Sequence, residues 1–253
     1  MNIFIIISLF FHLLLPAPEG NQREIEALRQ WRAEEIVSAK SIEIFGKENI
    51  WRAEPISEQI FDRMKGRSYK DNCTLPLDSL RYLNLLHYDA EGNIRLGEMV
   101  CHKAVSESLI AIFKELYEAR YPIERMVLID NYGADDELSM RANNTSAFNF
   151  RFAAGSTTVL SSHSMGTAVD INPLYNPYVK VREGRTIVEP TTARDYVDRT
   201  KSFPYKIVAG DLCHRLMLKH GVEWGGAWRS VKDYQHFEKR LKKYSMGIQN
   251  SHP

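Results

Sequence analysis

Apolar residues recur at steps of three and four positions in two parts of the chain, the spacing of a helix that lies with one face against a core. In residues 102–119 the apolar positions are Val105, Leu109, Ile112, Phe113 and Leu116. This stripe predicts a helix that ends before Pro122, because proline interrupts a helix. A looser pattern of the same kind in the charged residues 21–67 predicts a helical N-terminal extension, in which we find no chemical motif.

The sequence after residue 122 predicts short strands joined by polar loops. Residues 126–129 (MVLI) form a short apolar run between turn-like segments, which is typical of a buried strand. Residues 168–171 alternate as a strand does, and Asn172-Pro173 ends this strand because proline has no N–H for the ladder. Residues 180–204 are predicted to be a polar loop.

One further helix is predicted over residues 212–220. Asp211 can cap its first turn, and Gly221 can adopt the left-handed conformation that ends a helix. The chain therefore mixes helices and short strands without a regular strand–helix alternation, which predicts an α+β fold.

The first twenty residues, MNIFIIISLFFHLLLPAPEG, are apolar from Ile3 to Leu15 and then reach small and turn-forming residues. This order is typical of a secretory signal peptide, although no Lys or Arg precedes the apolar run. The run is shorter than the roughly 20 apolar residues of a membrane-spanning helix, so no stable membrane span is expected. We expect residues 1–20 to be removed and the protein to be exported to the periplasm, the extracellular space or the cell envelope.

The composition of the 253 residues, 44% hydrophobic and 26% charged, is that of a globular protein. Without residues 1–20 the chain has 33 basic against 31 acidic residues, a net charge of +2. A nucleic-acid-binding protein normally has a large basic excess on one face, so nucleic acid is not an expected partner. The cysteines Cys73, Cys101 and Cys213 cannot all pair within one chain, and whether two of them form a disulfide is open.

Two pairs of residues offer the donors of a metal site. In the first pair, His163 and Asp170 are seven positions apart, and a turn at Gly166 can bring both side chains back to one point. In the strand predicted at residues 168–171, Asp170 can face a cleft while its neighbours face the core. A His and an Asp at this spacing also occur by chance in many proteins, so this pair alone is a weak signal.

The second pair is Asp233 and His236, three positions apart, a spacing at which both can point the same way on a helical turn. His236 would complete a set of two histidines and one carboxylate, which holds zinc in hydrolases and leaves a fourth position for water. Asp233, not needed as a ligand, can take a proton from that water. The competing interpretation is a surface pair without chemistry.

The segments LSSHSMGTAVDINP and EWGGAWRSVKDYQHFE closely resemble the D-alanyl-D-alanine carboxypeptidase and L-alanyl-D-glutamate peptidase family of zinc peptidases. The signature of that family is Ser-x-His-x-x-Gly-x-Ala-x-Asp, followed far downstream by Trp-Gly-Gly and Asp-x-x-His. Every position is filled, by Ser161, His163, Gly166, Ala168 and Asp170 in the first part and by Trp224, Gly225, Gly226, Trp228, Asp233 and His236 in the second. The resemblance covers about residues 70–240, and two separated motifs in the right order are a specific match.

The resemblance implies a single compact α+β domain of the kind found in Hedgehog signalling proteins, with a small mixed or antiparallel sheet and flanking helices. This zinc peptidase domain is assigned to residues 68–245, after the signal peptide and the extension. The resemblance also implies one zinc ion per chain on His163, Asp170 and His236, with Asp233 as the general base.

By the same resemblance, Arg151 in FNFR stabilises the developing oxyanion and Ser161 binds the substrate. A guanidinium suits this role because it stays charged and donates two hydrogen bonds.

The implied activity is hydrolysis of peptide bonds in peptidoglycan stem peptides during cell-wall turnover. A D-alanyl-D-alanine carboxypeptidase and an L-alanyl-D-glutamate endopeptidase use the same apparatus, and the sequence does not decide between them. Two other functions remain open. One is a non-catalytic zinc-containing cell-wall binding module, which the presence of Asp233 disfavours, and the other is an intracellular dipeptidase, which would keep residues 1–20. The sequence also leaves the oligomeric state open.

Overall fold

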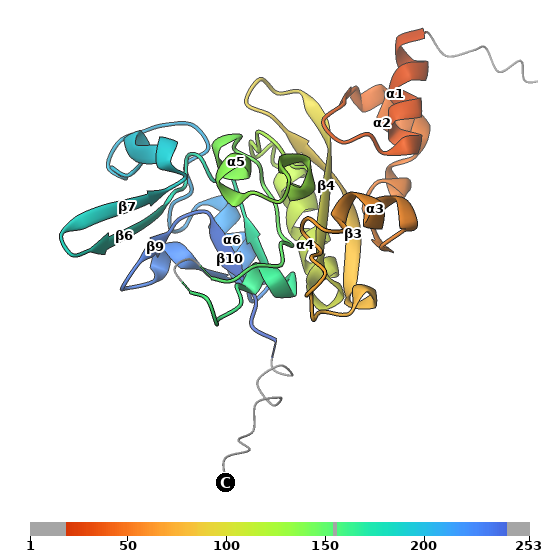
Figure 1. Ribbon diagram of the computed structural model, residues 1–253. Coiled ribbons are helices and arrows are strands. Elements are labelled where there is room, and N and C mark those ends of the chain that lie inside the picture. The colour runs from red at the N-terminus through yellow and green to blue at the C-terminus, as the bar shows by residue number, and fades with distance from the viewer. Residues whose placement is uncertain (1–18, 154–155, 242–253) are drawn as a thin grey trace, which may run out of the picture.

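The longest strands, β3 (Leu80–Tyr88) and β4 (Ile94–His102), pair antiparallel along their whole length at the centre of the first sheet. The structure is a computed structural model, and it describes residues 19–153 and 156–241 (Figure 1). The short strands β1 (Ile36–Val37) and β2 (Arg52–Pro55) complete this sheet, whose order is β1-β4-β3-β2.

Two smaller antiparallel sheets lie in the C-terminal half, with the orders β5-β10-β8 and β7-β6-β9. Their strands are β5 (Ala168–Asp170), β6 (Tyr178–Arg182), β7 (Arg185–Glu189), β8 (Glu223–Trp224), β9 (Lys232–Asp233) and β10 (His236–Glu238). The α-helices of the described residues are α1 (Glu19–Gln30), α2 (Ala39–Phe45), α3 (Glu58–Met64), α4 (Lys103–Glu118), α5 (Asp136–Arg141) and α6 (Leu212–Lys219). Helices combined with small antiparallel sheets in one compact chain confirm the predicted α+β fold.

Both helices that the chain was expected to form after residue 100 are present within one or two residues of their predicted ends. α4 covers the apolar stripe, and all five of its stripe residues are buried. α6 follows Asp211, whose side chain accepts a hydrogen bond from His214 N, and Gly221 beyond its end has a φ of +72°. These are the ends that a side-chain cap and a left-handed glycine produce.

Both faces of the first sheet are buried, because apolar side chains point alternately to its two sides. Leu83 and Met99 belong to the core that contains α4. Leu86 and Leu96 belong to a second core, which contains residues of the N-terminal helices. The sheet is therefore the middle layer between α4 and the N-terminal segment.

The N-terminal residues 21–67 cover the second face of this sheet and extend both of its edges. Leu28 of α1 is fully buried in the second core, and the Trp31 indole donates a hydrogen bond to Gly97 O at 2.8 Å. The segment also supplies β1 and β2, so it is partly helical and partly strand. The domain boundary between residues 67 and 68 stays a prediction. Residues 1–18 of the predicted signal peptide lie outside the described residues.

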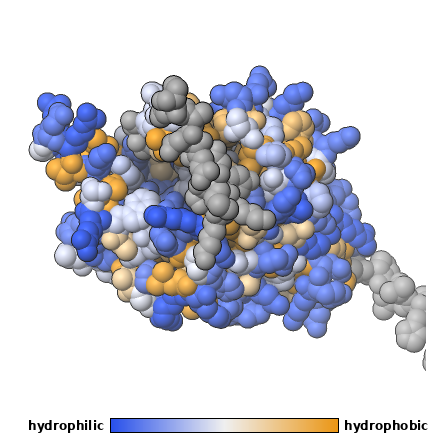
Figure 2. Space-filling model, turned by 90° about the horizontal axis from the view of Figure 1, so that it is seen from below, coloured by the Kyte–Doolittle hydropathy of each residue, from blue (hydrophilic) through white to orange (hydrophobic). Residues whose placement is uncertain are grey.

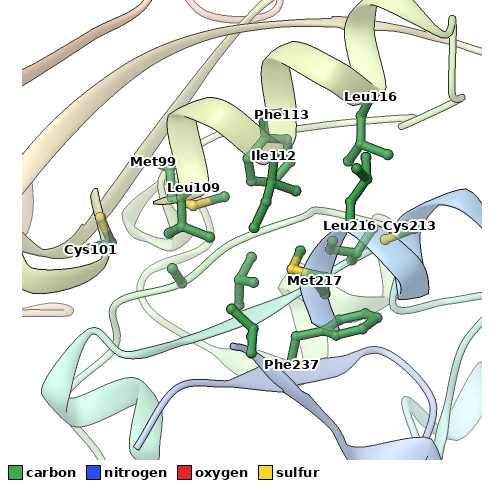
Figure 3. Packing of buried hydrophobic residues seen from close by; sticks show 14 of the residues in the cluster. Met99, Cys101, Leu109, Ile112, Phe113, Leu116, Cys213, Leu216, Met217 and Phe237 are labelled. Carbon is green, nitrogen blue, oxygen red and sulfur yellow. The ribbon is translucent and has the colours of Figure 1, made fainter. Parts of the chain in front are cut away.

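The first core joins α4 to the C-terminal elements (Figure 3). Ile112 and Phe113 point from α4 toward Met217 of α6 and Phe237 of β10, and all four side chains have no exposed surface. Because Phe237 lies on β10, this packing fixes the sheet β5-β10-β8 against α4.

The prediction of a strand at residues 126–129 is wrong, although these residues are buried as expected. Two of their backbone N–H groups donate to side chains: Val127 N donates to Asn144 Oδ1 at 2.9 Å, and Leu128 N donates to Glu98 Oε1 at 3.3 Å. Side chains thus satisfy donors that a neighbouring strand would otherwise satisfy, so an apolar run is buried without being a strand.

The prediction of a loop at residues 180–204 is also wrong, because β6 and β7 form a hairpin there. Its two-residue turn, Glu183-Gly184, has φ values of +52° and +72°, as a type I′ turn requires. The residues of β7 before Val188 are exposed, so the hairpin has the polar composition of a loop. The short helical turn η5 (Thr191–Tyr196) follows it.

The surface of the described residues is mostly hydrophilic on the face seen in Figure 2, with hydrophobic residues scattered over it. Among residues 19–153 and 156–241, no helix combines the length and the apolar composition needed to cross a membrane. The cysteines are free thiols, of which Cys101 and Cys213 are buried and Cys73 is partly buried.

His87 on β3 is expected to make stability depend on pH. Its Nδ1 lies 2.7 Å from Ile123 O, and burial lowers the pKa of the ring to about 4. Because this pKa is below the unfolded value of about 6.5, the unfolded state takes up the proton first as the pH falls, and stability is lost between about pH 6.5 and 4. We expect the free energy of unfolding, measured in urea, to lose about 3 kcal/mol from this group.

The matched variant is His87→Gln, which keeps a donor for Ile123 O and cannot ionise. Its unfolding free energy should fall less than that of the wild type over this pH range. Parallel pH profiles for the two proteins would contradict the assignment.

Candidate metal centre and active site

His163 is placed by a tight turn, η4 (Ser162–Met165), whose flanking residues belong to the first motif. Ser161 caps the turn, with its Oγ accepting a hydrogen bond from His163 N at 3.3 Å. Gly166 ends it with a φ of +65°, and a Cβ at this position would lie 2.7 Å from His102 N. Only glycine fits here, and the turn directs the His163 side chain inward, where the residue is 4% exposed.

Asp170 and His236 are brought together by strand pairing. They lie directly opposite each other on β5 and β10, so their side chains share one face of the sheet. The next pair in the register, Val169 and Phe237, points to the other face and is buried in the core. The alternation along residues 168–171 predicted this orientation of Asp170 and Val169.

The ring nitrogens of both histidines are oriented by their neighbours. His163 Nδ1 lies 2.6 Å from Ala147 O, which can only accept, so Nδ1 carries the proton and Nε2 the lone pair. His163 Nε2 lies 3.2 Å from Asp170 Oδ2 and 3.2 Å from His236 Nδ1. His236 Nδ1 lies 3.1 Å from Asp170 Oδ1.

These contacts fit a zinc ion. Ligand atoms about 2.0–2.1 Å from a tetrahedral zinc are roughly 3.3 Å apart, close to the separations of the three side chains. The ligand atoms of His163, Asp170 and His236 all lie within 4.8 Å of one another. Two imidazoles and one carboxylate are also donors that zinc prefers, and three ligands leave a fourth position free. The described residues can therefore hold a metal of this kind.

Asp233 and His236 do not share a helical turn, contrary to the prediction. Asp233 lies opposite Tyr178 in the pairing of β9 with β6, whereas His236 lies in β10. The chain passes from one small sheet to the other within two residues, Tyr234 and Gln235. Both side chains nevertheless reach the same cleft.

The Asp233 carboxyl is shielded in this cleft. Its Oδ1 is buried and accepts no hydrogen bond from the described residues. Gly225 of the second motif packs against the backbone and Cβ of Asp233, since a Cβ at position 225 would lie 2.7 Å from Asp233 O and 2.9 Å from Asp233 Cβ. Burial raises the pKa of Asp233 to about 7, although the charge of His236 opposes the shift. A carboxyl with such a pKa can accept and return a proton near neutral pH.

Arg151 reaches the cleft from the segment before the first motif. Its backbone N–H donates to Ser164 Oγ at 2.8 Å, which ties Arg151 to the turn that holds His163. Its guanidinium forms an ion pair with Asp136 of α5, a residue that the sequence did not single out.

One cleft of about 860 Å³ contains all the predicted site residues, namely Arg151, Ser161, His163, Asp170, Asp233 and His236. The cleft is also lined by Trp228 of the second motif and by residues that sequence reasoning missed, among them Asp136, Tyr178, Glu189, Gln235 and Glu238. The Trp228 ring lies 5.3 Å from the His236 ring. The arrangement can hold a metal, exchange a proton at Asp233 and offer a cation at Arg151.

Residues 154–239 match the family model described as D-alanyl-D-alanine carboxypeptidase. The matched segment contains both motifs, including the metal-binding group and Asp233, and Arg151 lies just before it. This match supports the peptidase family that the motifs resemble, and with it a peptidase role that acts on a peptide substrate. Searches of curated proteins and of solved structures found no match.

Proposed function

We propose that the protein is a zinc-dependent peptidase that hydrolyses peptide bonds in the stem peptides of peptidoglycan. The observation that carries the proposal is the Asp233 carboxyl, whose Oδ1 accepts no hydrogen bond from residues 19–153 and 156–241 and which lies in the same cleft as a group that fits zinc. A non-catalytic zinc module would need the metal group and not this carboxyl. We also propose that the protein is exported, as its first twenty residues predict.

Zinc on His163, Asp170 and His236 would supply a Lewis acid that polarises the substrate carbonyl and acidifies the attacking water. Asp233 takes the proton from that water and returns it to the leaving amine, because its carboxyl lies in the same cleft as the metal-binding group. Arg151 stabilises the negative charge that develops on the carbonyl oxygen, since its guanidinium stays charged and donates two hydrogen bonds.

The proposal is tested by zinc analysis of the purified protein together with digestion of muropeptides. One zinc per chain and new products detected by mass support it. Free D-alanine identifies a D-alanyl-D-alanine carboxypeptidase, and a new D-glutamyl N-terminus identifies an L-alanyl-D-glutamate endopeptidase. Bound zinc without cleavage favours the non-catalytic cell-wall module, and the absence of zinc contradicts the proposal. N-terminal sequencing of the exported protein tests removal of the signal peptide.

Replacing Arg151 by methionine is expected to lower kcat by at least about a hundredfold to a thousandfold, because the charged group that donates to the oxyanion is lost. Arg151→Lys should restore only part of the rate, since lysine keeps the charge and lacks the planar fork. Steady-state kinetics on one muropeptide measures both. Arg182→Met, at an exposed arginine of the β6–β7 hairpin, is the control and should keep the wild-type rate. Equal rates in Arg151→Met and the control would exclude the role.

A further inference from the structure

The two ring nitrogens of His236 face different partners. Nδ1 faces the other metal-binding residues, whereas Nε2 lies 3.4 Å from Glu238 Oε2 and 3.4 Å from Ser162 Oγ. A ring nitrogen that binds a metal uses its lone pair, so a neutral His236 that binds through Nδ1 carries its proton on Nε2. The acceptors of that proton are then Glu238 and Ser162, and only Glu238 is charged.

Glu238 is held beside His236 by the sheet itself. Residues two apart on a strand share a face, so β10 places both side chains on one side. The backbone of Glu238 is paired on both sides, with Ala168 of β5 and with Glu223 of β8. Its side chain is 16% exposed, and its second oxygen, Oε1, lies 3.5 Å from Arg240 Nε. The carboxylate is thus confined next to Nε2.

We propose that Glu238 is a positioning residue of the metal centre. Its carboxylate accepts the hydrogen bond from His236 Nε2–H, which fixes the proton on Nε2 and aims the Nδ1 lone pair at the metal. The inference rests on the proposed zinc site. A carboxylate partner of this kind orients a ligating histidine and raises its basicity, and its loss typically weakens metal binding by about tenfold to a hundredfold.

Zinc affinity tests the proposal, measured by competition with a chromogenic chelator. Glu238→Gln is expected to raise the Kd for zinc by about tenfold to a hundredfold. The matched control is Glu223→Gln, which removes one negative charge directly across the strand pair and also loses a 3.5 Å contact with Arg240. The Glu223 side chain is 57% exposed and does not line the cleft, so this variant should bind zinc like the wild type.

Thermal unfolding of the metal-free proteins separates positioning from a general loss of structure. Metal-free Glu238→Gln should still unfold in one cooperative transition, although it loses the contacts of the carboxylate with His236 and Arg240. Unchanged zinc affinity in Glu238→Gln, with tight binding by the wild type, overturns this inference and leaves the proposed function standing. A wild type that binds no zinc overturns both.

A second measurement needs no variant. In the zinc-loaded wild type labelled with ¹⁵N-histidine, long-range NMR correlations report which ring nitrogen of His236 carries the proton. A proton on Nδ1 overturns the proposal. A proton on Nε2 is what binding through Nδ1 requires, and the zinc affinity of Glu238→Gln then decides whether Glu238 positions the ring.

Discussion

Asp233→Asn is expected to lower kcat/KM for peptide cleavage by about a hundredfold to ten-thousandfold, the typical contribution of a general base. Asparagine has nearly the same shape, so it should keep the packing against Gly225 and leave the zinc content unchanged. The loss then reflects proton transfer alone. Single-turnover kinetics on a muropeptide, combined with zinc analysis, measures the two quantities separately. A variant that cleaves like the wild type would assign the base to another residue.

The pH profile gives an independent check on Asp233. Only the ionised carboxylate can accept a proton, so kcat/KM should fall as the pH drops through the pKa of this group. Burial raises that pKa to about 7, and a bound cation would lower it, so the acid limb should lie at or below about pH 7. This limb should disappear from the residual activity of Asp233→Asn.

His163→Ala is expected to abolish zinc binding at the site, because the two remaining ligands are too few to hold the ion. All cleavage above background should be lost with the metal. The wild type treated with a chelator should be equally inactive and should recover when zinc is added back, whereas the variant should not recover. His220→Ala removes a histidine that does not line the cleft and is the control. Cleavage that persists when elemental analysis finds no metal would falsify the metal-dependent mechanism.

Local signals in the sequence predicted how His163 and Asp170 are placed, whereas the full metal-binding group with His236 came from the resemblance of two separated motifs to a peptidase family. Gly166 and Ser161 flank His163 within a few residues, and the alternation at residues 168–171 directs Asp170 to the cleft. The parts that depend on pairing between distant segments were not predictable in this way. His236 meets Asp170 through the register of β5 and β10, which no local pattern encodes.

The prediction of a helical turn at Asp233 and His236 was wrong, and for this reason Glu238 was not recognised as a neighbour of the His236 ring. On a helical turn, residues 236 and 238 would point in different directions, whereas on β10 they share a face. Asp136 was missed for a different reason, since its contact with Arg151 joins α5 to a segment 15 residues later. The hairpin of β6 and β7 was missed because the exposed part of β7 has the composition of a loop.

The burial of the first sheet on both faces limits where the chain can be shortened. A fragment that begins at residue 68 would lose α1, α2 and α3 together with β1 and β2. It would expose Leu86 and Leu96 to water and leave both long strands with open edges, a surface that favours aggregation. A soluble, active preparation of this protein therefore requires the segment from about residue 19 onward, even though every predicted site residue lies after residue 150.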